Sequence, residues 1–335
     1  MMIFWIGFLA FIGCLLALDL GVFHKTDEEP DTKSALRWTL VWVLVALAFS
    51  GFIYGAYSHH WFGIGLGPNG LPPLGLNGLP LDPATAGKTA AMDFITGYLI
   101  EYSLSLDNIF VIAMIFTFFK IPGKYQHRAL FWGIIGAIVL RGALILAGTA
   151  LVSRFEWVLY LFGFFLVFTA IKMLFKGDEE IDPEHSWIVK GVRKFYPVSP
   201  VLVNNHFFTK LPDGRKAVTR LFLALVLIEN TDLIFALDSI PAIFAVTKDP
   251  FIVFTSNIFA ILGLRSLFFA LSAMLNKFHL LKYSIVAVLG FVGVKMLVVY
   301  FEIHISSPIS LTVIVTSLTL GVVASLAFPP KTTSP

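Results

Sequence analysis

Nine stretches of the chain are apolar enough and long enough to cross a lipid bilayer as helices. A spanning helix needs about 20 predominantly apolar residues, because the hydrocarbon core is about 30 Å thick. The pattern predicts an all-α polytopic membrane protein with about nine transmembrane helices. The nine stretches cover approximately residues 2–22, 36–57, 93–119, 127–152, 156–175, 220–246, 251–275, 281–301 and 308–328.

The composition agrees with a membrane protein and narrows its chemistry. Hydrophobic residues make up 57% of the 335 positions and charged residues 13%, against roughly 45–50% and 25% in soluble domains. The net charge of +3 comes from basic residues in short loops, so we expect no nucleic-acid partner. The single cysteine, Cys14, cannot form an internal disulfide or a thiolate metal site.

The basic residues predict the orientation of the chain, because cytoplasmic loops collect Lys and Arg. The loops and ends assigned to one side of the membrane hold 17 basic residues, and the opposite side holds only Lys88, Arg154 and Lys248. We therefore expect the N-terminus outside, the C-terminus in the cytoplasm and the lipid bilayer as the surrounding medium.

The polar segments divide the chain into six parts. The segment after the second helix is rich in Gly and Pro, which predicts an external loop, and a longer charged segment predicts a cytoplasmic linker. The parts are two N-terminal helices (1–57), the external loop (58–92), a first three-helix unit (93–175), the linker (176–219), a second three-helix unit (220–302), and a C-terminal helix with its tail (303–335).

The two three-helix units resemble one another in sequence. Residues 157–174 align with 280–297, Leu140-Arg141 aligns with Leu264-Arg265, and DNIFVI at 107–112 aligns with DLIFAL at 232–237. The offsets of 123, 124 and 125 residues are nearly constant. Each unit has an odd number of spans, so the second unit enters the membrane from the opposite side, and the two are predicted to be inverted repeats, an arrangement found in many secondary transporters.

Five acidic residues fall in the interior of the third and sixth predicted membrane helices. Each carboxylate near the bilayer centre costs on the order of 2.5–3.5 kcal/mol unless it is paired, hydrated or bound to a cation. Pairing with the four basic residues of the spans, Arg141, Lys172, Arg265 and Lys295, is the structural alternative. The two arginines are expected either to pair with carboxylates or to anchor helix ends, and the lysines to reach the interface. The five acids are Glu101, Asp107, Glu229, Asp232 and Asp238.

Amide and hydroxyl oxygens accompany these acids, whereas His and Cys are absent from the same two helices. Carboxylates, amides and hydroxyls together favour hard divalent ions such as Mn²⁺, Ca²⁺ or Mg²⁺. A straight helix cannot aim every acid at one point, because Asp107 lies about 120° from the Glu101 face. Pro241 either opens the backbone near Asp238 or merely kinks the helix. The candidate metal ligands are Glu101, Asp107, Asn108, Glu229, Asp232, Asp238 and Ser239.

Two long motifs resemble the signature regions of the TerC family, the tellurium-resistance membrane proteins that include the alkaline-induced Alx branch. They are EYSLSLDNIFV at 101–111 and the segment from 228 to 265 that begins IENTDLIFALDSIP. The resemblance implies a bacterial inner-membrane protein of the LysE-like transporter superfamily, with members linked to manganese export and tellurite resistance. It also implies that the family's acidic and polar positions match the seven candidate ligands.

We therefore expect a transporter, not an enzyme, that exports Mn²⁺ by alternating access. No ATP-binding motif of the G-x-x-x-x-G-K-[ST] type occurs, so proton coupling is expected. Asp107 and Asp232 are predicted as the central ligands, and the other acids as further ligands or proton carriers. No organic cofactor is expected, and the sequence names no protein partner. The alternative is a non-transporting factor that assists membrane-protein insertion or assembly, or tellurite resistance.

Overall fold

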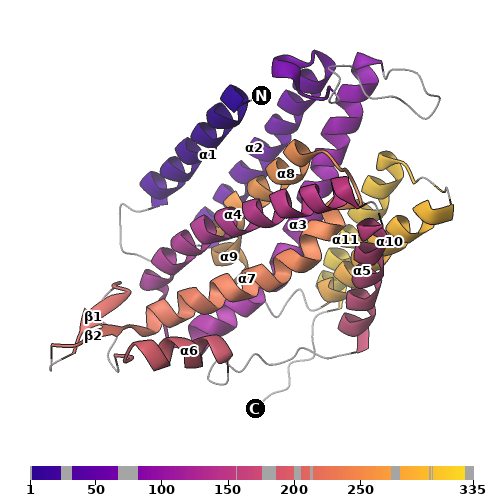
Figure 1. Ribbon diagram of the computed structural model, residues 1–335. Coiled ribbons are helices and arrows are strands. Elements are labelled where there is room, and N and C mark those ends of the chain that lie inside the picture. The colour runs from indigo at the N-terminus through magenta and orange to yellow at the C-terminus, as the bar shows by residue number, and fades with distance from the viewer. Residues whose placement is uncertain are drawn as a thin grey trace.

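The structure is a computed structural model that describes residues 2–23, 32–66, 82–155, 157–175, 186–199, 205–211, 214–272, 280–301, 303 and 305–328. Helices dominate the described residues, and one short hairpin is present (Figure 1). The long helices are α1 (Met2–Phe23), α2 (Thr32–Ser58), α3 (Pro83–Phe118), α4 (Gly123–Arg154), α5 (Val158–Phe175), α7 (Arg220–Phe244), α8 (Pro250–Leu262), α9 (Leu264–Ser272), α10 (Leu281–Val298) and α11 (Ser307–Ala327).

The described helices confirm an all-helical polytopic membrane protein. Six of them, namely α2, α3, α4, α5, α10 with the following 3₁₀ turn, and α11, are long and apolar enough to cross a membrane. The pair α8 and α9, which meet at a bend of 41°, makes a seventh if it is one broken span. Helix α7 has 25 residues but carries three acids in its interior, and the apolar stretch assigned within α1 is only Trp5–Asp19. The count of nine stays a prediction.

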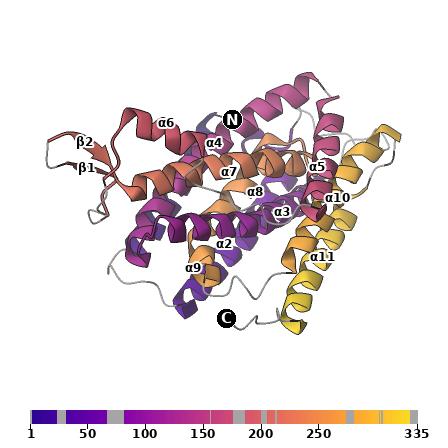
Figure 2. The same cartoon turned by 90° about the horizontal axis from the view of Figure 1, so that it is seen from below.

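Helices α3 and α7 lie at the centre of the molecule and contact each other. Helix α3 also packs against α8, and α7 packs against α4, so each central helix contacts the second helix of the other three-helix unit. The third helices, α5 and α10, pack tightly against one another. Figure 2 shows α5, α10 and α11 at one end of the molecule and the hairpin at the opposite end.

Polar side chains cap the N-termini of α7 and α8. The Thr219 hydroxyl accepts a hydrogen bond from the backbone of Phe222 at the start of α7, and Asp249 accepts two at the start of α8. These bonds satisfy amides that have no partner within the helix. Helix α7 continues through Pro241 to Phe244.

The predicted cytoplasmic linker contains two ordered elements in its described part. Helix α6 (Trp187–Phe195) packs against α7. Strands β1 (Phe208–Lys210) and β2 (Lys216–Val218) pair antiparallel, with Phe208 opposite Val218. In the predicted external loop, η1 (Trp61–Gly63) is a 3₁₀ turn. A second 3₁₀ turn, η3 (Val299–Phe301), follows α10. Most of the Gly/Pro-rich loop (67–81), parts of the linker and the C-terminal tail lie outside the described residues.

Candidate metal site around Arg141

A buried arginine joins the two central helices. Arg141 on α4 is 2% exposed. Its Nε and Nη2 donate to the two carboxylate oxygens of Asp232 on α7, over 3.0 and 2.7 Å. Its Nη1 donates to Glu101 on α3. One guanidinium therefore contacts a carboxylate from each central helix, which agrees with the alternative that the intramembrane acids pair with basic residues of the spans.

Two asparagines complete the contacts of these carboxylates. Nδ2 of Asn108 donates to Asp232 over 3.0 Å, and Nδ2 of Asn257 on α8 donates to Glu101 over 2.8 Å. Both asparagine side chains are buried, at 1% and 0% exposure. The Oδ1 atom of each has no hydrogen-bond partner among the described residues. A buried amide oxygen without a partner is uncommon and needs a physical reason.

Helical periodicity brings these side chains to one place. Glu101 and Asn108 are seven residues apart on α3, and Asp232 and Ser239 are seven apart on α7, so each pair occupies one helix face. The hydroxyl of Ser239 lies 3.5 Å from Nη1 of Arg141, at the limit of a hydrogen bond. We call Glu101, Asn108, Arg141, Asp232, Ser239 and Asn257 the central polar cluster.

The other predicted ligands lie apart from one another. Asp238 accepts a hydrogen bond from the hydroxyl of Thr169 on α5, over 3.2 Å. Glu229 packs against Gly136 of α4, where a Cβ atom would lie only 2.0 Å from the carboxylate. Asp107 is half-buried. Within the part of the chain that the structure describes, no three His, Cys, Asp or Glu residues gather closely enough to hold a metal ion.

The second intramembrane arginine makes a different ion pair. Nη2 of Arg265 on α9 lies 3.0 Å from the carboxylate of Asp19 on α1 and donates to its backbone oxygen over 2.6 Å. Both arginines of the spans therefore pair with carboxylates. Lys295, which the sequence predicts at the interface, is instead buried and donates to Ser310 of α11 over 2.9 Å. The reason is tertiary, since α11 covers this face of α10.

The sequence indicated most of the central polar cluster but missed Asn257. That residue lies on α8, within the 228–265 segment but outside its acidic part, and its signal was the polar run Thr255-Ser256-Asn257 in an otherwise apolar helix. Sequence reasoning also left the role of Arg141 open. Neither residue could be assigned without knowing which helices pack against α3 and α7.

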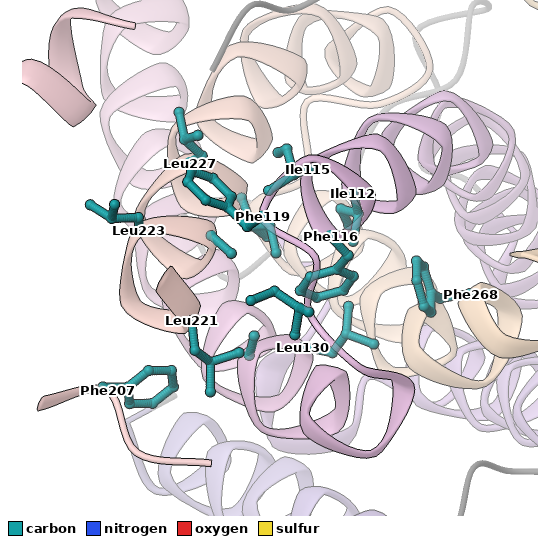
Figure 3. Packing of buried hydrophobic residues seen from close by; sticks show 14 of the residues in the cluster. Ile112, Ile115, Phe116, Phe119, Leu130, Phe207, Leu221, Leu223, Leu227 and Phe268 are labelled. Atoms are coloured by element: carbon teal, nitrogen blue, oxygen red, sulfur yellow. The ribbon is translucent and has the colours of Figure 1, made fainter. Parts of the chain in front are cut away.

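Apolar side chains close the central polar cluster on two sides. One group, shown in Figure 3, includes Ile112, Phe116, Leu130, Leu221 and Phe268 from four helices. A second group contains Ile145, Ile240, Phe244 and Val253. A narrow cavity borders Asp232 and Asn108, with room for about one water molecule. The side of the cluster formed by Asp232 and Asn108 therefore has little room for water.

Comparison with known proteins identifies relatives over nearly the whole chain. An uncharacterized membrane protein of Myxococcus xanthus is 46% identical over 322 residues, 96% of this chain and 91% of its own. A candidate membrane-bound redox modulator of Escherichia coli K12, Alx, is 40% identical over 311 residues, 92% of this chain and 90% of its own. No solved structure matches. The model of the integral membrane protein TerC family matches residues 86–333, so the chain belongs to the TerC family.

Proposed function

We propose that the chain transports a divalent metal ion across the membrane, that the ion is Mn²⁺, and that the physiological direction is export from the cytoplasm. The observation that supports this most strongly is the convergence of two carboxylates from two helices on a single cation, the Arg141 guanidinium, in an apolar interior. Ionisable residues inside a membrane protein commonly mark an ion pathway. The same carboxylates would face a metal ion if the guanidinium withdrew.

The donor atoms around this point favour a hard ion. Two carboxylates, two amides and one hydroxyl supply only oxygen, which suits Mn²⁺, Ca²⁺ or Mg²⁺ and disfavours ions that prefer nitrogen or sulfur ligands. Mn²⁺ is the member of this group that the family resemblance indicates. The remaining candidate ligands, Asp107, Glu229 and Asp238, are assigned to the pathway on either side of the central polar cluster, where they relay the ion or carry the exchanged proton.

The contacts support inverted repeats and favour a different register for their first helices. Shifting the alignment to an offset of 131 residues pairs Leu106-Asp107 with Leu237-Asp238 and pairs Glu101 with Asp232. These last two residues are the ones that share Arg141. In an inverted repeat, equivalent residues lie about a pseudo-two-fold axis near the midplane. We therefore assign Glu101 and Asp232 as the central pair, in place of Asp107 and Asp232.

In this proposal, the two apolar groups that flank the central polar cluster act as the two gates of alternating access. In the predicted orientation, Leu130 and Leu221 lie toward the cytoplasmic ends of α4 and α7, and Phe244 lies at the external end of α7. Parting the group around Phe116 and Phe268 would open the cluster to the cytoplasm. Parting the group around Phe244 would open it to the outside, as export requires. A proton gradient would supply the driving force, because protons compete with the metal ion for the same carboxylates.

The test is transport by the purified chain in liposomes, followed with a dye that Mn²⁺ quenches. Wild-type protein should move Mn²⁺, and a pH gradient should accelerate the flux. Glu101→Gln and Asp232→Asn keep the side-chain volume but remove a charge, and each should reduce the flux at least about tenfold. Asp93→Asn, a change at another buried acid of α3 that instead accepts from Ser307 over 2.6 Å, should leave it unchanged.

Two outcomes would contradict the transport proposal. Wild-type liposomes that stay impermeable to Mn²⁺ under a pH gradient would remove it. A flux that survives both central substitutions would remove the proposed site, and tolerance of isosteric changes is what the assembly-factor alternative predicts. Cys14→Ser serves as a further control, because transport by oxygen ligands should not depend on the exposed thiol.

A further inference from the structure

We propose that Arg141 is a tethered cation that fills the metal site between transport events, and that Asn108 and Asn257 supply amide oxygens to the metal ion once Arg141 withdraws. This inference rests on the proposed function and names the ligands and the competitor of that same site. It adds Asn257 as a metal ligand and gives Arg141 a role beyond structural pairing.

The contacts of Arg141 are those of a bound cation. Its guanidinium takes both oxygens of Asp232 and one of Glu101, and it is almost completely buried. A metal ion that binds these oxygens must displace the guanidinium, because two cations in one apolar site repel each other strongly. Arg141 stays attached to α4, so it can return when the metal ion leaves, and the carboxylates are never left without a positive partner.

The asparagine oxygens provide the second, independent observation. Oδ1 of Asn108 and Oδ1 of Asn257 are each buried without a partner, while the amide nitrogen of the same side chain donates to a central carboxylate. Rotation of an asparagine amide about its χ2 bond exchanges the positions of its nitrogen and oxygen atoms. With a metal ion on the carboxylates, the turned amide would present oxygen to the ion, whereas its nitrogen suits the metal-free state.

Manganese binding by the detergent-solubilised full chain, measured by titration calorimetry, tests the competition. Replacing Arg141 with glutamine removes the competing charge, so Arg141→Gln should bind Mn²⁺ at least about tenfold more tightly than wild type. Its transport in liposomes should fall, because nothing displaces the ion. The matched control is Arg154→Gln, a change at an exposed arginine at the end of the same helix whose guanidinium lies over the Phe155 ring, and its Mn²⁺ affinity should equal that of wild type.

Two further variants keep the test decisive if Arg141→Gln does not fold. Arg141→Lys retains the charge but loses the two-pronged contact with Asp232, and should bind Mn²⁺ more tightly than wild type. Asn257→Cys separates a ligand from a structural donor. A metal ligand at this position predicts that binding shifts from Mn²⁺ toward the softer Cd²⁺, whereas a purely structural donor to Glu101 predicts an unchanged preference between the two ions.

The outcomes separate the two proposals. Wild-type protein that neither binds nor transports Mn²⁺ removes the proposed function and this inference together. If wild type binds and transports Mn²⁺ but the Arg141 variants bind it equally or more weakly, the transport proposal stands and the tethered cation is wrong. An unchanged preference between Mn²⁺ and Cd²⁺ in Asn257→Cys, with an unchanged unfolding temperature, removes Asn257 from the ligand set.

Discussion

The ion pair between Asp19 and Arg265 should hold α1 against the rest of the molecule. Arg265 is 1% exposed and Asp19 is 5% exposed, so each charge depends on the other for compensation. Removing one partner of a buried pair costs about 3–5 kcal/mol, because the remaining charge stays buried. We therefore expect Asp19→Asn and Arg265→Gln each to lower the free energy of unfolding by about this amount.

The double variant should be far less destabilised than the sum of the single variants. Replacing both charges leaves two neutral amides, so the loss should be at least about 3 kcal/mol smaller than the sum of the two single losses. The assay is reversible unfolding in mixed detergent micelles, with a fluorescent label on Cys14, the single cysteine of the chain and an exposed residue of α1, as a local reporter. Additive losses in the double variant would refute the reasoning and show that the two side chains act independently.

Three further predictions follow from other parts of the chain. Reporters inserted in the β1–β2 hairpin and at η1 should give cytoplasmic and external signals respectively, and signals from one side only would contradict the predicted orientation. Gly293→Val should lower the unfolding free energy by about 1–3 kcal/mol, because a Cβ there would lie 2.9 Å from backbone atoms of α5. Gly290→Ala should have little effect, because the nearest atom to a Cβ there would be 3.9 Å away. The pKa of Asp82, at the start of α3, is lowered by hydrogen bonds from Thr85, so this helix start is stabilised above the unfolded-state pKa and loses that stabilisation as pH falls through the folded-state pKa. The protection factor of the Thr85 amide against hydrogen exchange should therefore fall in acid. A protection factor in Asp82→Ala at neutral pH equal to that of wild type would contradict this.

The amino-acid sequence by itself determined the class of protein, the family and the two helices that carry the acids. Apolar runs and intramembrane charges can be recognised one segment at a time, since a lipid environment penalises each exposed polar group wherever it occurs. Of the two alternatives that the sequence left open for the intramembrane arginines, the structure shows pairing with carboxylates, because an unpaired guanidinium inside a bilayer is very costly. These inferences require no knowledge of how the helices cross.

Which acids share a partner was decided by the tertiary structure alone. On a single helix, Glu101 and Asp107 are equally plausible ligands, and only the approach of α4 and α8 selects Glu101 as the carboxylate that meets Arg141 and Asn257. The same packing gives Arg265 to Asp19 rather than to the centre, although both arginines occupy similar positions in their units. A local pattern specifies which face of a helix is polar. The partner of that face depends on contacts between residues from 40 to 246 positions apart, which a local pattern does not encode.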